Sequence, residues 1–255
     1  MTTALTGAGL LEQRLRADAP AVVPYLTAGF PTIERFADAL AAVAAISEAV
    51  EIGIPFSDPM ADGATIQESS RIALEAGATL ELVISALESI GALPCPLVVM
   101  SYLNPLMAFG FDRLLPRLSG VGVAGLVVPD LPLDESEDLR GVAAEHGVGL
   151  VQLVTPVTED DRLRRLGEAS EGFTYAVTMT GTTGGSAGVG SDVAGYLDRV
   201  RGVSRAPVLA GFGVRSSDQV RSLVPHCDGV IVGSALVEVL GREEDPVAFL
   251  TGLRP

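Results

Sequence analysis

The feature of this chain that most limits its fold is a repeated succession of short apolar runs, each followed by a loop and a helical pattern. Most of the runs are continuously apolar, which is typical of parallel strands covered on both faces. We therefore expect eight parallel strands, at Ala21–Thr27, Ala49–Gly53, Leu97–Ser101, Gly125–Val128, Leu150–Val154, Gly172–Ala176, Val208–Ala210 and Gly229–Val232.

The segments between these runs carry the signals of helices. Thr32, Thr79 and Thr158 are expected helix starts, because a threonine hydroxyl can cap the first turn. A loop and two helices fit between the second and third runs, and Leu5–Leu15 predicts a helix ahead of the first strand. The pattern indicates an α/β fold, a single (β/α)8 TIM barrel over residues 1–255 with an extra N-terminal helix. The alternative is an open doubly wound sheet, which eight strands disfavour.

The charge and the apolar pattern limit the partners of this chain. Its net charge of −15 argues against nucleic acid and against anionic membrane surfaces. The first residues lack the basic start and apolar core of a signal peptide, and no apolar run reaches the length of a membrane span. We therefore expect a cytoplasmic protein that binds neither nucleic acid nor membranes.

Several common chemistries are excluded by the residues that the chain lacks. All seventeen basic residues are arginines, so lysine Schiff bases, covalently held pyridoxal phosphate and a Walker A loop are not expected. The two histidines, His146 and His226, are interpreted as structural, and we expect no metal site. Cys95 and Cys227 lie too far apart in the sequence to suggest a disulfide framework or a zinc motif.

Two carboxylates mark the second expected strand and the loop after it. Glu51 lies among residues that should be buried, and burial without a partner raises the pKa of a carboxyl group. Asp62 follows in a turn-rich loop, so both side chains should meet at the carboxyl ends of the barrel strands. The pair predicts acid–base chemistry with two separable roles. Otherwise Glu51 is a solvated strand residue and Asp62 a turn former before Gly63.

Glycine-rich turns follow the last three expected strands. Glycine lets backbone N–H groups approach an anion, and the loops after strands seven and eight commonly bind phosphate in such barrels. The alternative for each glycine is tight-turn geometry alone. The candidate phosphate-binding residues are Gly184, Gly213, Gly233 and Ser234.

Apolar and aromatic residues at or near the strand ends predict a slot for a flat ring. The alternative for part of this set is packing inside the barrel. The candidates are Tyr25, Met100, Tyr102, Val127, Leu153, Tyr175, Phe212 and Val232.

Several of these residues lie in specific sequence motifs that extend over most of the chain, from about Ala21 to Leu240. Together the motifs make the chain similar to the tryptophan synthase alpha subunit family. They are Glu51-Ile-Gly-Ile-Pro-Phe-Ser-Asp-Pro-Met-Ala-Asp-Gly with Thr65-Ile66-Gln67, Pro24-Tyr25-Leu26-Thr27-Ala28-Gly29, Tyr102-Leu103-Asn104-Pro105, Pro129-Asp130-Leu131-Pro132, Gly211-Phe212-Gly213-Val214 and Val232-Gly233-Ser234-Ala235.

The resemblance implies a retro-aldol cleavage of indole-3-glycerol phosphate to indole and glyceraldehyde 3-phosphate, without a cofactor in this chain. It implies that Glu51 protonates the indole carbon and takes a proton from the glycerol hydroxyl, while Asp62 binds the ring N–H. Tyr175 would assist beside the ring. The glycines named above and Ser234 would hold the phosphate.

The resemblance also implies a partner, a pyridoxal phosphate-dependent beta subunit in an α2β2 complex. Asp58, Asn104 and Pro132 match positions at that partner surface. The Thr180–Gly190 segment corresponds to a lid in which Thr183 would meet the second carboxylate on closure. The lid departs from the family pattern, with Thr182 where valine and Met179 where arginine is usual.

Three other functions compete with a catalytic alpha subunit. One is a stand-alone lyase that releases free indole, and a second is a non-catalytic partner that only activates a beta subunit. A third is another phosphate-binding barrel, such as an epimerase, which the scarcity of histidine disfavours. Intact Glu51 and Asp62 argue against the non-catalytic partner.

Overall fold

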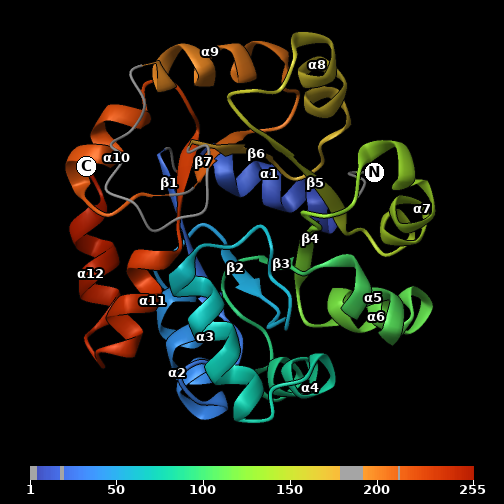
Figure 1. Cartoon of the computed structure of the whole chain (residues 1–255), viewed down its shortest axis with the longest axis vertical. Helices are drawn as coiled ribbons and strands as arrows, with labels where there is room; N and C mark the ends of the chain where they lie inside the picture. Colours follow the sequence, from blue (N-terminus) through green and yellow to red (C-terminus); the bar gives the residue numbers. More distant parts are fainter. Residues whose placement is uncertain (1–4, 18–19, 179–191, 212) are drawn as a thin grey trace.

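The computed structural model describes residues 5–17, 20–178, 192–211 and 213–255. Within them, parallel strands pair in sequence order and the last strand pairs with the first, so the sheet closes into a barrel (Figure 1). This confirms the predicted (β/α)8 barrel and excludes the open sheet. The strands are β1 (Ala21–Thr27), β2 (Val50–Gly53), β3 (Leu97–Met100), β4 (Val123–Val127), β5 (Gly149–Val154), β6 (Thr174–Val177), β7 (Val208–Gly211) and β8 (Gly229–Val232).

Helices surround the barrel (Figure 1). Within the described ranges, no helix is long and apolar enough to cross a membrane. The helices are α1 (Gly7–Ala17), α2 (Ile33–Ala44), α3 (Ala64–Glu75), α4 (Leu80–Ile90), α5 (Leu103–Phe109), α6 (Phe111–Gly120), the 3-10 turn η1 (Leu133–Glu135), α7 (Glu137–Glu145), α8 (Asp160–Ala169), α9 (Val193–Val203), α10 (Ser217–Leu223), α11 (Ser234–Gly241) and α12 (Pro246–Leu253).

The predicted elements are confirmed, with strand ends that differ from the prediction by at most two residues. Thr32 and Thr79 cap α2 and α4 as expected, each accepting a backbone N–H through its hydroxyl. Thr158 as a helix start is wrong, because α8 begins at Asp160 with Glu159 as its N-cap. The Thr158 hydroxyl instead accepts the Thr155 N–H at 3.0 Å, which closes the turn before the helix.

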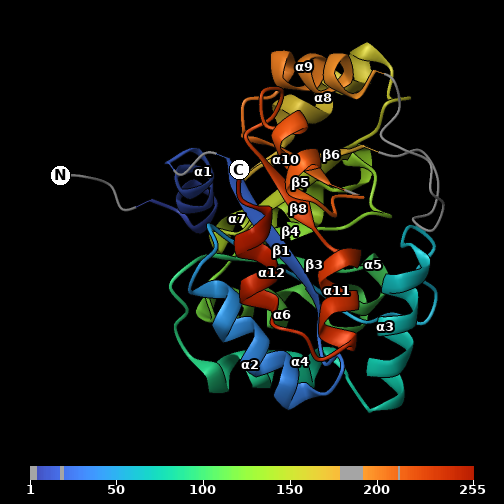
Figure 2. The same cartoon turned by 90° about the vertical axis from the view of Figure 1, so that its left-hand side faces the viewer.

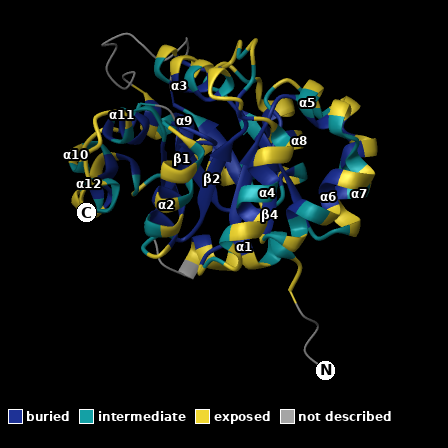
Figure 3. Cartoon of the chain, turned by 90° about the horizontal axis from the view of Figure 1, so that it is seen from below, coloured by how far each residue is buried: buried dark blue, intermediate teal, exposed yellow. Residues whose placement is uncertain are grey.

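The core consists of two layers that alternate residue by residue along each strand. Side chains such as Val23 and Val98 pack inside the barrel, whereas Val22 and Ile52 pack between the strands and the helices. Figure 3 shows the buried strands at the centre and the exposed residues on the outer faces of the helices. The carboxylate of Glu51 follows the inward alternation, since its strand neighbours Val50 and Ile52 both belong to the outer layer.

Helix α1 covers the end of the barrel where the strands begin, opposite α3 and α11 (Figure 2). Its Leu11 side chain is fully buried. The side chain fills space that glycines leave open, because a Cβ on Gly125 or Gly172 would lie 3.1 Å or 2.8 Å from Leu11 Cδ2. The extra N-terminal helix predicted from the sequence is therefore a plug that closes this end.

A partly buried ion pair ties the C-terminus to the same end. Arg254 Nη1 lies 2.8 Å from Glu48 Oε1, and its Nη2 also donates to the Ile46 carbonyl at 2.6 Å. The other oxygen of Glu48 accepts the Val22 N–H at 3.0 Å. Each oxygen of this buried carboxylate thus has a hydrogen-bond donor, the arrangement that a stable buried charge requires.

Candidate active site

Glu51 occupies the interior of the barrel, in register with Tyr25 on β1 and Val98 on β3. Its side chain is fully buried, and neither carboxylate oxygen has a hydrogen-bond partner among the described residues. Burial, and then the nearby charge of Asp62, raise the pKa of Glu51 to about 8. Glu51 therefore carries a proton at neutral pH and can act as an acid.

Asp62 lies in the loop between β2 and α3, where Tyr102 holds it. The Tyr102 hydroxyl donates to Asp62 Oδ2 at 3.2 Å and accepts the Ala61 N–H at 2.9 Å. Gln67 Nε2 donates to the Asp62 carbonyl at 2.9 Å, which fixes the backbone of the same turn. Burial raises the pKa of Asp62 to about 6, although the Tyr102 hydrogen bond opposes the rise. Asp62 is therefore mostly ionised at pH 7.

Two buried tyrosines lie over glycines near these carboxylates. A Cβ on Gly53 would lie only 1.9 Å from the Tyr25 hydroxyl, and a Cβ on Gly211 would lie 2.3 Å from Tyr175 Cε1. The two glycines thus leave the space that the phenol rings occupy. Burial raises the pKa of both tyrosines well above the usual value, so both remain protonated hydrogen-bond donors.

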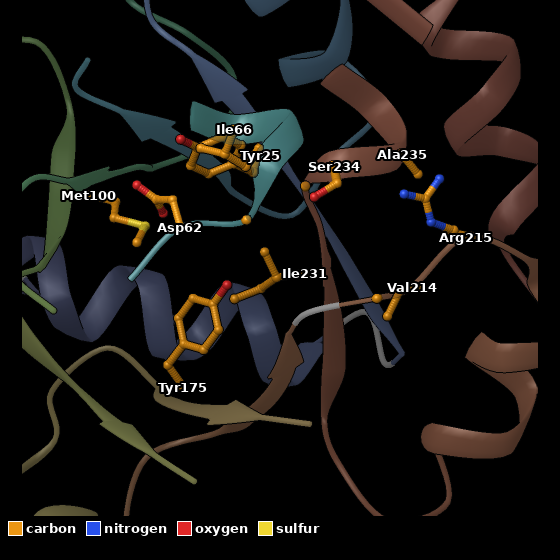
Figure 4. A pocket seen from close by; sticks show the side chains of 13 residues that line it. Tyr25, Asp62, Ile66, Met100, Tyr175, Val214, Arg215, Ile231, Ser234 and Ala235 are labelled. Atoms are coloured by element: carbon orange, nitrogen blue, oxygen red, sulfur yellow. The ribbon is translucent and has the colours of Figure 1, made fainter. Parts of the chain in front are cut away.

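One pocket at the carboxyl ends of the strands joins Asp62 and the two tyrosines. Figure 4 shows Asp62 and Met100 on one side of it, and Ser234, Ala235 and Arg215 on the other. Most of the lining is apolar, with a few polar groups, as in sites that bind a ring. The lining residues are Tyr25, Asp62, Gly63, Ile66, Met100, Tyr175, Gly213, Val214, Arg215, Ile231, Gly233, Ser234 and Ala235.

The far end of this pocket consists of the turn after β7 and the start of α11. Gly213 has a φ of +87°, a conformation that side chains rarely adopt. Gly233 is the N-cap of α11 and Ser234 its first residue, and the first N–H groups of a helix have no intrahelical acceptor. This end can accept an anion such as phosphate.

Seven of the predicted site residues line the pocket, and Glu51 and Tyr102 lie against residues that do. Val127 is buried inside the barrel, while Leu153 lines a neighbouring groove with Pro132. Val232 as a ring contact is wrong, because it is fully buried in the layer between strands and helices. The adjacent Ile231 points into the pocket instead. The seven are Tyr25, Asp62, Met100, Tyr175, Gly213, Gly233 and Ser234.

The predicted lid with Thr183, together with Gly184 and Phe212, lies outside the described residues. The expected partner residues Asp58, Asn104 and Pro132 are all exposed, and each follows a barrel strand.

Ile66, Ile231 and Arg215 also line the pocket, and they are not among the site residues predicted from the sequence. All four residues of β8 are apolar or glycine, so no polar residue shows which face of the strand points inward. Ile231 could therefore not be identified as inward-facing from the sequence alone. Arg215 follows the predicted phosphate turn by two residues, and its charge beside that turn was an available signal.

Neither histidine lines this pocket. His146 ends α7, and His226 Nδ1 lies 2.9 Å from Asp198 Oδ1 near the surface. Within the described ranges, no group of three or more acidic, cysteine or histidine side chains could hold a metal ion.

The family model "Tryptophan synthase alpha chain" matches residues 11–249. The chain belongs to the tryptophan synthase alpha chain family. A relative from Nitratidesulfovibrio vulgaris is 43% identical over 95% of this chain and 97% of its own length. A relative from Arabidopsis thaliana is 40% identical over 89% of this chain and 83% of its own. Both are named tryptophan synthase alpha chain.

Solved structures agree with this membership. A tryptophan synthase structure from M. tuberculosis superimposes with a TM-score of 0.86 at 34% identity, covering 98% of this chain and 97% of that one. A structure from Pyrococcus furiosus, of the tryptophan synthase α2β2 complex, gives 0.83 at 35% identity, covering 91% and 97%. The family cleaves indole-3-glycerol phosphate as the alpha subunit of tryptophan synthase, and this chain is a lyase of that type.

Proposed function

We propose that this chain cleaves indole-3-glycerol phosphate at the pocket described above, with Glu51 as the acid and base and Asp62 as the partner of the indole nitrogen. The observation that carries the proposal is the pair of carboxyl groups whose pKa values, about 8 and about 6, lie on either side of neutral pH. Two neighbouring carboxyl groups separated in this way can take the acid and the ionised role at once.

Glu51 begins the reaction. Its protonated carboxyl gives a proton to the ring carbon that carries the glycerol chain, which leaves a positive charge on the ring. The resulting Glu51 carboxylate takes the proton of the hydroxyl on the adjoining carbon. The carbon–carbon bond then breaks, its electron pair returns to the ring, and indole and an aldehyde form.

Asp62 stabilises the positive charge on the ring. Its carboxylate is ionised at neutral pH and accepts the ring N–H, so the charge that develops at the nitrogen meets a fixed negative charge. The Tyr102 hydroxyl at 3.2 Å orients that carboxylate. Tyr175, which lines the pocket and whose pKa is raised by burial and then by Glu51, assists beside the ring.

The phosphate lies at the other end of the pocket. Gly213, Gly233 and Ser234 offer backbone N–H groups there, and Gly184 belongs to the same proposed set. The indole itself accepts the electron pair, so the reaction needs no cofactor in this chain. We place the enzyme in the cytoplasm, where its substrate and partner would be made.

A beta subunit that carries pyridoxal phosphate is the proposed partner, in an α2β2 assembly. Support comes from the strand-end face of the barrel, where large apolar side chains are exposed on loops beside the site. Met60 is 76% exposed and Val157 is 78% exposed. Exposed apolar groups that gather on one face are typical of protein interfaces. The exposed Asp58, Asn104 and Pro132 belong to the same face.

The test is steady-state formation of indole by the purified chain, alone and with a beta subunit. We expect slow formation by the chain alone and a marked increase with the beta subunit. Fast formation without a partner would instead identify a stand-alone lyase. No indole under either condition would contradict the proposed activity and favour a non-catalytic activator.

A further inference from the structure

Arg215 is the positively charged residue among the described residues that line the pocket, and the mechanism above does not use it. It follows Gly213 by two positions in the turn between β7 and α10. Figure 4 shows its side chain beside Ala235, at the end of the pocket that lies across from Asp62. This cation therefore stands at the rim of the end assigned to phosphate.

Glu238 fixes the direction of the Arg215 guanidinium. Nη1 donates to Glu238 Oε2 and Nη2 donates to Glu238 Oε1, both at 2.8 Å. Glu238 lies one turn along α11 from Ser234, and the Thr65 hydroxyl donates to its Oε1 at 3.3 Å. The ion pair thus holds the guanidinium against α11, whose N-terminus forms part of the pocket wall.

The pair leaves part of the guanidinium available to another anion. An arginine side chain has five N–H donors, and Glu238 accepts two of them from Arg215. The other three have no acceptor among the described residues. The Arg215 side chain is 52% exposed, so an incoming ligand can reach it. Planar guanidinium groups bind phosphate oxygens through such N–H donors.

We propose that Arg215 recognises the substrate phosphate at the pocket rim, with Glu238 orienting its guanidinium. The inference rests on the proposed function, because it takes the phosphate to lie at Gly213, Gly233 and Ser234. A positive charge is needed at this position because the chain has a net charge of −15 and Asp62 lies in the same pocket. A dianionic substrate is repelled by this charge, and a fixed cation at the rim offsets the repulsion.

The experiment compares Arg215→Met with wild type by two measurements. Calorimetry with inorganic phosphate gives a Kd, and indole formation with the beta subunit present gives KM and kcat. We expect about a tenfold rise in both Kd and KM, with kcat changed less than about twofold, because the lost contact is made to a group remote from the reacting bond. Arg215→Lys keeps the charge but loses the planar fork that Glu238 orients, so its Kd and KM should lie between those of wild type and those of Arg215→Met.

Arg71→Met is the matched control. Arg71 is 54% exposed and pairs with Glu68 and Glu75 on α3, so its loss changes the net charge by the same amount and removes ion pairs that lie outside the pocket. We expect its Kd and KM to match wild type. Thermal melting of each variant checks that it is folded.

An unchanged Kd and KM in Arg215→Met would overturn the inference, as would an equal loss in Arg71→Met. Loss in Arg215→Lys as large as in Arg215→Met would overturn the role of charge. The proposed function fails separately: a wild-type chain that forms no indole contradicts the lyase activity, while weaker phosphate binding by Arg215→Met would still support the rim cation.

Discussion

The end of the barrel where the strands begin and the barrel interior each bury a glutamate, and the two glutamates differ in their hydrogen-bond partners. At the end where the strands begin, Glu48 is held by Arg254 and by the Val22 N–H. Three residues further along the chain, Glu51 is buried inside the barrel with no hydrogen-bond partner among the described residues. Both side chains are buried to a similar degree, so the difference lies in their partners.

The contrast separates stability from chemistry. A paired carboxylate ties segments together, as Glu48 joins the C-terminus to β1. An unpaired one is held protonated by burial, and that proton is available for transfer. Glycines leave room for side chains in both places, for Leu11 at the closed end and for Tyr25 and Tyr175 beside the carboxylates.

The largest expected effect is on turnover in Glu51→Gln. The amide would fill the same space as the carboxyl group but could not exchange a proton, so kcat should fall by about a thousandfold, within the usual range for a lost acid–base group. Substrate Kd, measured by calorimetry, should change less than about threefold. Glu48→Gln is the control and should keep the wild-type kcat. Turnover near wild type in Glu51→Gln would remove the assigned role.

The second effect is on the pH dependence of stability. The folded protein holds the Glu51 proton up to a pKa of about 8, whereas the unfolded chain releases it near 4.5. The free energy of unfolding should therefore fall as pH rises between these values, by at most about 1.4 kcal/mol per pH unit from this group. Asp62 adds a smaller fall between 3.8 and about 6.

Urea unfolding at several pH values measures this dependence. Glu51→Gln removes the titrating group, so its stability should decrease less with pH than that of wild type. Parallel curves for the two proteins would show that Glu51 does not hold a proton in the fold.

The third effect is the loss of stability in Glu48→Gln. Breaking this partly buried ion pair leaves Arg254 without its charged partner, and we expect about 2 kcal/mol of destabilisation, less than for a fully buried pair because Arg254 is partly exposed. Urea denaturation measures it, and Arg254→Met should give a similar loss that does not add to the first. Wild-type stability in both variants would contradict the clamp.

The smallest effect is expected in Tyr102→Phe. Loss of the hydroxyl removes the hydrogen bond that lowers the pKa of Asp62, so that pKa should rise. Asp62 then ionises at a higher pH, and the acid side of the pH–rate profile should move upward with about a tenfold lower kcat/KM at neutral pH, as for a lost hydrogen bond to a charged group.

Phe56→Leu is the control for this change. It removes the ring that stacks on Tyr102 at 5.1 Å but keeps the hydroxyl, so the pH–rate profile should keep its position. A profile that moves equally in both variants would mean that ring packing, and not the hydroxyl, controls Asp62.

Particular residues show how far the sequence could be read. The strands Ala21–Thr27 and Gly229–Val232 lie where the apolar runs predict them. The inward face of the last run was missed, since Val232 points outward and Ile231 inward. A strand buried on both faces has no polar residue to mark which side is which. The prediction that Thr158 starts a helix was wrong because a threonine hydroxyl can cap a helix or close a turn, and the sequence does not show which.

The sequence by itself determined the number and order of the strand–helix units, the absence of lysine chemistry, and the pair Glu51 and Asp62 on one strand and its loop. Apolar period and residue type are local properties, so they can be read without coordinates. Only the tertiary structure decided that Glu51 has no partner among the described residues, that Tyr102 holds Asp62, and that Arg215 stands at the far end of the pocket. These facts depend on which distant segments the closed barrel brings together, and that closure is not encoded in any one segment.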